Sequence, residues 1–170
     1  MRRTLPSLAV IILVAAGLTA AETTEQLQWE NRSDIPEAYR WNIADILPDE
    51  AAFDATVTEV EEMLPKLTAY RGRLGESPDV LADALDLFYE IQKASEDAIV
   101  WANQRQNTDT RDQAANASQA RSRSFGGKVG EAASFLAPEI AQIPPEIIES
   151  FLENKRLATY RHIIDDIMRT

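Results

Sequence analysis

Apolar residues recur along much of the chain at alternating spacings of three and four, which is the period of an amphipathic α-helix. A first such helix is expected to start near Asp49. Its apolar stripe comprises Phe53, Val57, Val60, Leu64 and Leu67. Pro65 lies inside this stretch, and an interior proline costs about 3 kcal/mol because it lacks a donor and clashes with the preceding turn. We therefore expect a kink or a restart of the helix there.

The start of the second predicted helix is well marked. Gly72 and Gly75 bracket a connection, and Ser77 followed by Pro78 provides an N-cap and a proline at the first helical position. The helix is expected to run to about Asn107. Its apolar stripe comprises Leu81, Leu85, Phe88, Ile91, Ala98 and Ala102.

A third helix is expected after a cap at Asp109 or Thr110. Its predicted inward positions are mostly small: Ala114, Ala117, Phe125, Val129, Ala132 and Leu136. Gly126, Gly127 and Gly130 each cost about 1 kcal/mol relative to alanine in a helix. We interpret these glycines as sites where a neighbouring helix packs closely.

Prolines divide the C-terminal part of the sequence. Pro138 and the pair Pro144 and Pro145 bound two short predicted helices, and the second contains Ile147, Ile148, Phe151 and Leu152. A last helix should place Leu157, Tyr160, Ile164 and Ile167 on one face. No run of alternating β-branched residues bounded by turns occurs, so the predicted fold is all-α, an antiparallel helical bundle without a sheet.

The N-terminus has the layout of a secretory signal peptide. Arg2 and Arg3 precede an uncharged apolar run from Leu8 to Leu18, and small residues follow as far as Ala21. This run is too short for a membrane-spanning helix, which needs about 20 apolar residues. We expect cleavage after Ala21, export to the periplasm and no stable membrane anchor.

The predicted organisation is a signal peptide at 1–21, an irregular arm at 22–48 and one helical domain at 49–170. The formal net charge of −11 argues against nucleic acid as a partner, because binding of phosphate backbones depends on clustered Lys and Arg. The short cluster at 121–123 is interpreted as a solvated helix face. The sequence contains no cysteine, which excludes disulfides and thiol chemistry.

Candidate chemistry is sparse. His162 could pair with Asp165 or Asp166 on one helix face, yet the chain has 1 His and no Cys, whereas a zinc site commonly needs three or four protein ligands. We interpret His162 as a surface or interface histidine and assign no catalytic, cofactor-binding or metal-binding residue. The glycines at 126–130 lack the spacing and the preceding strand of a phosphate-binding loop.

Three segments resemble the N-terminal region of oligoendopeptidase F, in order and at similar spacing. They are IPEAYRWNIADILPDEAAFDA from Ile35, LPKLTAYRGRLGESPDVLADALDLFYEI from Leu64, and ENKRLATYRHIIDDIMR from Glu153. The positions that carry the resemblance are Trp41, Asp45, Tyr70, Arg71, Gly72, Leu74, Tyr160, Arg161 and His162.

The resemblance implies an all-helical fold in which this region forms one wall of a channel over a distant zinc site. In that family zinc is held by HExxH and a further glutamate, and the glutamate of HExxH activates the metal-bound water. None of these residues can be matched here. The chain is therefore expected to contain no cofactor and to be inactive alone, although zinc serves the full-length family.

Two main hypotheses follow. In the first, the chain is a truncated or split, non-catalytic part of an exported zinc metallopeptidase that hydrolyses short peptides. Its uncovered apolar face would then favour association with a separate catalytic metallopeptidase domain or with itself. In the second, it is a stand-alone periplasmic helical protein that binds short peptides or acts as an adaptor. A hydrolase that uses His162 is a third and weaker hypothesis.

Overall fold

The computed structural model describes Trp29 and residues 32–169. This part of the chain contains helices and no strands, which confirms the all-α prediction. The predicted signal peptide at 1–21 and the beginning of the predicted arm lie outside the described residues. No helix within the described part is long and apolar enough to cross a membrane.

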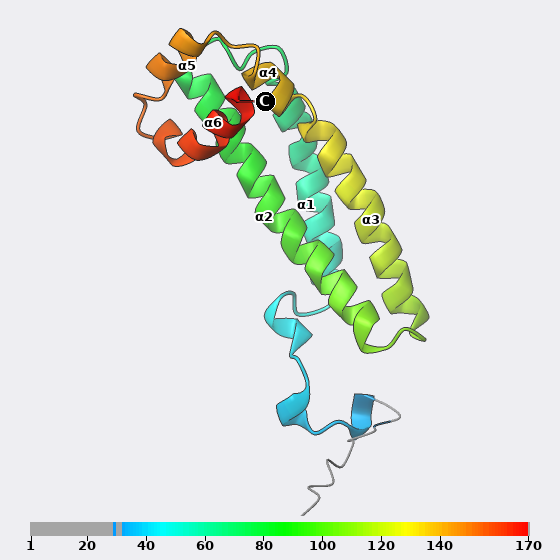
Figure 1. Ribbon diagram of the computed structural model, residues 1–170. Helices are drawn as coiled ribbons and strands as arrows, with labels where there is room; N and C mark the ends of the chain where they lie inside the picture. The colour runs from blue at the N-terminus through cyan, green and yellow to red at the C-terminus, as the bar shows by residue number, and fades with distance from the viewer. Residues whose placement is uncertain (1–28, 30–31, 170) are drawn as a thin grey trace, which may run out of the picture.

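Three long helices form the body of the molecule: α1 (Glu50–Thr68), α2 (Pro78–Thr108) and α3 (Gln113–Ala133). They run antiparallel to one another in chain order (Figure 1) and each contacts the other two. With 31 residues, α2 is about 46 Å long at the usual rise of 1.5 Å per residue. The bundle is therefore a rod rather than a sphere.

Short elements lie at the two ends of this rod (Figure 1). At the end where α2 begins lie α4 (Leu136–Ile140), α5 (Pro145–Phe151), η4 (Leu157–Tyr160) and α6 (Arg161–Met168). At the opposite end is an arm of three 3-10 turns, η1 (Arg32–Asp34), η2 (Glu37–Tyr39) and η3 (Ile43–Asp45). Over its described residues the arm consists of these short turns and the segments between them.

The first helix begins where it was predicted, because the Asp49 carboxylate accepts the Ala52 N–H at 2.9 Å. The predicted restart at Pro65 is wrong: α1 continues through it to Thr68. The Pro65 carbonyl accepts the Ala69 N–H at 3.1 Å. Because the helix ends one turn later, the missing donor removes a single bond and does not divide the element.

The start of α2 is confirmed, since the Ser77 hydroxyl accepts the Val80 N–H at 3.2 Å and Pro78 is the first helical residue. The helix ends at Thr108, one residue beyond the predicted end. Trp101 was not in the predicted stripe, yet it is buried and its ring stacks on Phe53 with the centroids 5.3 Å apart. This contact anchors α2 to α1.

The predicted cap and inward face of α3 are wrong in its first half. Asp112 is the cap, and its carboxylate accepts the N–H groups of Ala114 and Ala115 at 2.8 and 3.2 Å. Asp109 instead pairs with Arg111 at 2.9 Å. Ala114 and Ala117 are exposed. The residues that α3 buries are Ala115, Ser118, Gln119, Ser122, Phe125 and Ala132.

Polar burial on α3 is possible because its serine hydroxyls are satisfied locally. The Ser118 hydroxyl shares its one proton between the Ala114 carbonyl, at 2.9 Å, and the Glu50 carboxylate, and Ser122 donates to the Gln119 carbonyl at 2.9 Å. A hydroxyl bonded to its own helix can face a neighbour without an unpaired donor. Ser122 is therefore part of the buried face, and only its two arginine neighbours fit the predicted solvated face.

The glycine interpretation is also largely wrong. A Cβ atom on Gly126 would lie 3.4 Å from the Ile99 Cδ1 atom of α2. A Cβ atom on Gly127 or Gly130 would meet nothing within 4 Å. Only Gly126 therefore lies where α2 and α3 approach each other, and α3 remains helical through all three positions.

The short helices extend the same core. Pro138 lies inside α4 rather than before it, and the predicted last helix is divided into η4 and α6. Leu157 and Ile164 are fully buried and Tyr160 is half-buried, so the predicted apolar face is confirmed. Buried side chains from α1 to α6 form one continuous cluster.

Candidate functional site

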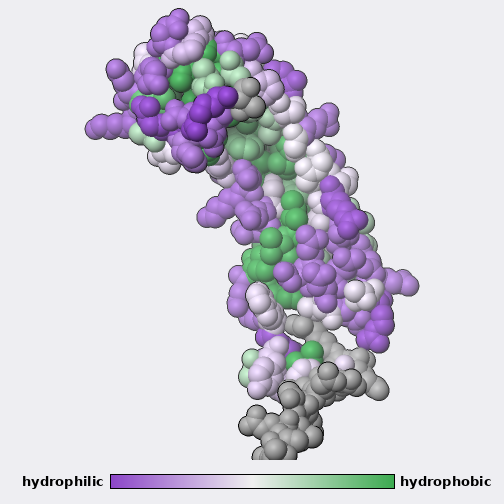
Figure 2. All heavy atoms as spheres, in the orientation of Figure 1, coloured by the Kyte–Doolittle hydropathy of each residue, from purple (hydrophilic) through white to green (hydrophobic). Residues whose placement is uncertain are grey.

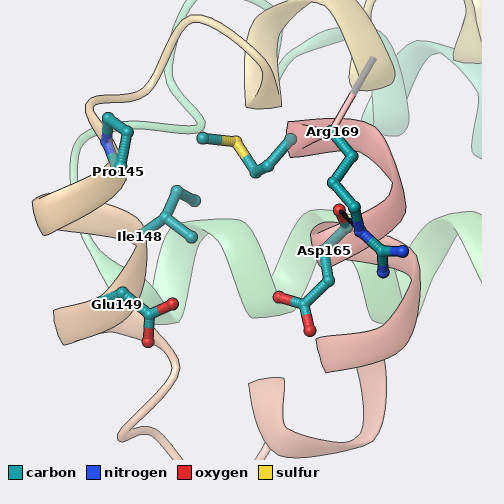
Figure 3. Close-up of a pocket in the computed structure, with 6 residues that line it drawn as sticks. Pro145, Ile148, Glu149, Asp165 and Arg169 are labelled. Atoms are coloured by element: carbon teal, nitrogen blue, oxygen red, sulfur yellow. Dashed lines mark hydrogen bonds between the residues drawn. The ribbon is translucent and has the colours of Figure 1, made fainter.

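A small pocket lies between α5 and α6 (Figure 3). It has a volume of about 240 Å³ and is lined by Pro145, Ile148, Glu149, Asp165, Met168 and Arg169. Ile148 belongs to the buried core. The carboxylates of Glu149 and Asp165 point toward one another from the two helices (Figure 3). The pocket thus combines an apolar interior with two carboxylates and one guanidinium group.

An apolar groove of about 380 Å³ lies between α2 and α3. Its lining includes Ile99 and Val100 from α2, and Gly126 and Val129 from α3. Figure 2 shows hydrophobic residues at the surface along the middle of the bundle, between hydrophilic regions. This is the kind of surface that a partner can cover.

The arm presents aromatic side chains to solvent. Trp41 is 79% exposed and Tyr39 is 69% exposed. The rings of Trp29 and Tyr39 stack with their centroids 6.4 Å apart. Aromatic residues are enriched in protein interfaces, so the arm is a second surface suited to contact with another molecule.

His162 does not lie in any of these places. Its side chain is 84% exposed and its Nε2 atom is 3.7 Å from an Asp166 carboxylate oxygen. Within 32–169 and Trp29, no three His, Cys, Asp or Glu side chains are grouped so that they could hold a metal ion.

The comparisons with known proteins identify the fold's relatives. No protein-family model matches the sequence. Oligopeptidase PepF of Bacillus subtilis (strain 168) is 27% identical over 154 residues, which cover 90% of this chain and 23% of the relative. Group B oligopeptidase PepB of Streptococcus agalactiae is 25% identical over 81% of this chain and 23% of its own length.

The crystal structure of oligoendopeptidase-F from Enterococcus faecium superposes with a TM-score of 0.66 and 28% identity. The match covers 71% of this chain and 24% of that structure. The chain is thus similar in sequence and fold to oligoendopeptidase F proteins. It spans about a quarter of the length of these relatives, as an N-terminal domain would.

The Arg-Gly-x-Leu motif of the oligoendopeptidase F resemblance forms a structural lock in this domain. Gly72 has a φ of +79°, a left-handed conformation that favours glycine. Its N–H donates to one oxygen of the Glu139 carboxylate at 2.8 Å, and the Leu74 N–H donates to the other at 2.7 Å. The Arg71 guanidinium lies 5.2 Å from the centre of the Phe135 ring. The motif thus fastens the α1–α2 connection to α4 and to the residue before it.

Tyr160 of the Tyr-Arg-His motif fastens η4 to α2. Its hydroxyl donates to the Asp86 carboxylate at 2.6 Å and its ring stacks on Tyr89. Arg156 pairs with Asp83 at 2.7 Å and also with Asp86. The Tyr160 bond and Arg156 lower the pKa of Asp86, while burial and the bond to Asp86 raise the pKa of Tyr160 to about 12. Both groups keep one protonation state near neutral pH, so they position the helices rather than transfer protons.

A third polar cluster joins all three long helices at the arm end. Glu50 of α1 pairs with Arg105 of α2 and accepts a hydrogen bond from the Ser118 hydroxyl of α3 at 2.8 Å. Arg105 and then Ser118 lower the pKa of Glu50. This contact and the two clusters described above fix the helices of the bundle relative to one another.

Sequence reasoning missed the pocket between α5 and α6. Glu149 was not singled out, and Asp165 was considered only with its neighbours on the same helix. The two carboxylates come from separate helices whose relative placement depends on the buried Ile148 and Ile164. No spacing along the sequence signals such a pair.

Proposed function

We propose that this chain is the channel-wall domain of an exported oligoendopeptidase F-like zinc metallopeptidase that hydrolyses short peptides, and that the chain alone is not catalytic. The proposal rests on one observation: 90% of the chain matches a curated oligopeptidase of which it covers 23%. A sequence with 1 His cannot supply the two histidines of HExxH. The zinc ligands must therefore come from residues outside 1–170, in the same polypeptide or a separate one.

The polar contacts that hold the helices of the bundle together support its role as one wall of a peptide channel. Its three long helices are fixed to one another at the arm end by Glu50. Its short helices are fixed to the α1–α2 connection by Glu139 and to α2 by Asp86. A wall held in this way can keep a narrow entrance that admits short, unfolded peptides and excludes folded proteins. Its contribution to catalysis is selection and orientation of the substrate.

Association with a zinc-binding region is supported by the apolar surfaces. The groove between α2 and α3 and the aromatic arm leave hydrophobic side chains at the surface. We propose that one or both are covered by a catalytic metallopeptidase region or by a second copy of this chain. Size-exclusion chromatography with light scattering would show which assembly forms.

Export is proposed from the N-terminal pattern alone, with cleavage near Ala21 and release into the periplasm. Mass spectrometry of the protein purified from its host should give a mature N-terminus at Glu22. A mass that retains residues 1–21 would reject the signal-peptide interpretation.

Peptidase activity of the 170-residue chain tests the main proposal. Incubated with zinc and an internally quenched peptide, the chain alone should bind no stoichiometric zinc and cleave nothing. Addition of an oligoendopeptidase F region that carries HExxH but lacks its N-terminal domain should restore cleavage. Stoichiometric zinc together with peptide cleavage by the chain alone would contradict the proposal. His162→Ala would then test the third hypothesis directly.

A stand-alone peptide-binding or adaptor protein is the alternative function. The observation in its favour is the single continuous core from α1 to α6, which lets this unit fold without further domains. Under this alternative the mature chain is a cooperatively folding monomer that binds peptides without zinc. It would also fail to restore cleavage when combined with the HExxH-bearing region.

A further inference from the structure

The pocket between α5 and α6 has an unbalanced charge. Asp165 makes no side-chain hydrogen bond or ion pair with any described residue. Glu149 has only a long contact, 3.7 Å, with Arg161. The two carboxylates face each other across the opening (Figure 3), and like charges placed in this way repel.

Arg169 does not neutralise this pair. Its Nε donates to the Asp165 backbone carbonyl at 3.0 Å, and its Nη2 lies 3.1 Å from the Asp166 carboxylate. Both contacts hold the guanidinium on α6, on the side of Asp165 that faces away from Glu149 (Figure 3). The space between Glu149 and Asp165 is therefore left to a cation from outside the chain.

The interior of the pocket determines which cation fits. Pro145, Ile148 and Met168 supply apolar walls, which a hydrated metal ion would not contact favourably. An alkyl chain would displace water from these walls, while its terminal charge would lie between the carboxylates. The volume of about 240 Å³ accommodates a chain of the size of a lysine side chain.

We propose that this pocket binds a primary ammonium group carried on a short alkyl chain. The chemistry is shared by two sources, the lysine side chain of a peptide and a free alkylamine. The lysine source rests on the proposed peptidase role and would make the pocket a subsite for basic peptides. The ammonium site itself does not depend on that role.

Selective labelling of methionine methyl groups with ¹³C allows a direct test on the whole chain. Met168 lines the pocket, and Met63 packs against the core in α1 as an internal control. Titration with pentylammonium should shift the Met168 signal saturably and leave the Met63 signal unchanged. Pentanol, which has the same chain without the charge, should bind at least about fivefold more weakly.

Charge removal provides the second part of the test. The double variant Glu149→Gln and Asp165→Asn should weaken pentylammonium binding by about fivefold to tenfold. The matched control, Glu90→Gln with Glu131→Gln, removes two exposed carboxylates outside the pocket and should change the affinity by less than about twofold, because distant exposed charges are screened. Unchanged unfolding midpoints would show that all variants fold.

Three results would overturn the proposal: no saturable Met168 shift, pentanol binding as tightly as pentylammonium, or equal weakening in the control variant. The source is decided with acetyl-Ala-Lys-Ala-amide and its norleucine counterpart. Tighter binding of the lysine peptide supports a peptide subsite. Binding of pentylammonium without binding of the lysine peptide supports the ammonium site with a free amine as its ligand. If the titration with pentylammonium or with the lysine peptide fails, cleavage by the combined peptidase is unaffected. The ammonium site and the proposed peptidase role can therefore fail separately.

Discussion

Glu139 should contribute more to stability than its position on a short helix suggests. Its two carboxylate oxygens accept the Gly72 and Leu74 N–H groups at 2.8 and 2.7 Å. Hydrogen bonds to a charged group contribute about 1.5–3 kcal/mol each when water cannot replace them. Gly72 is exposed, so water can satisfy its N–H in a variant, whereas the Leu74 bond is partly buried. We therefore expect Glu139→Ala to lose about 2 kcal/mol.

Urea unfolding followed by circular dichroism measures this loss, and thermal unfolding should show a decrease in Tm of about 4–8 °C. Glu139→Gln keeps one acceptor oxygen and should lose about half as much. Glu131→Ala, at an exposed position of α3, is the control and should change stability by less than about 0.5 kcal/mol. A Glu139→Ala variant as stable as this control would refute the structural role assigned to the lock.

Three further predictions concern other parts of the bundle. Tyr160 and Arg156 lower the pKa of Asp86, so the stability that the Asp86 carboxylate contributes is present above pH 3.8 and is lost as the pH falls through the lowered pKa. Tyr160→Phe should therefore cost about 0.5–1 kcal/mol of folding stability at neutral pH. Urea titrations at lower pH should show a smaller difference between the variant and the unmodified protein. Gly127→Ala should stabilise the protein by about 1 kcal/mol, since the added methyl group meets open space. Gly126→Ala should gain less because its methyl group would contact Ile99, and equal increases in Tm for the two variants would contradict this. His162→Ala should change the free energy of unfolding by less than about 0.5 kcal/mol, because the side chain is 84% exposed; a larger loss would reveal a contact that the structure does not contain.

The helical boundaries that depend on local chemistry were predicted well from the sequence. Asp49 and Ser77 cap α1 and α2 because an N-cap needs only the backbone N–H groups two or three residues ahead. The cap of α3 was misplaced because Asp109 and Asp112 both have suitable side chains. The choice depended on where the α2–α3 connection ends in space, and Asp109 is used by Arg111 instead.

The buried face of α3 shows a second limit of sequence reasoning. Alanine and serine recur along its first half and differ little in size, so apolar periodicity could not separate Ala114 from Ala115 or recognise Ser118 as buried. Burial was decided by the approach of α1 and α2, and by hydroxyl bonds that satisfy Ser118 within the cluster. A residue such as Phe125, whose size admits only an inward position, was predicted correctly.

The amino-acid sequence by itself determined the helical class, most helix boundaries, the lack of a histidine pair for zinc and the resemblance to oligoendopeptidase F. These depend on composition and on contacts within a few residues. Only the tertiary structure brought Glu139 to Gly72, Tyr160 to Asp86, and Glu149 to face Asp165. The first two pairs join residues that are 67 and 74 positions apart in the chain, and the third joins the short helices α5 and α6. In all three, the meeting is decided by the packing of whole helices against a shared core.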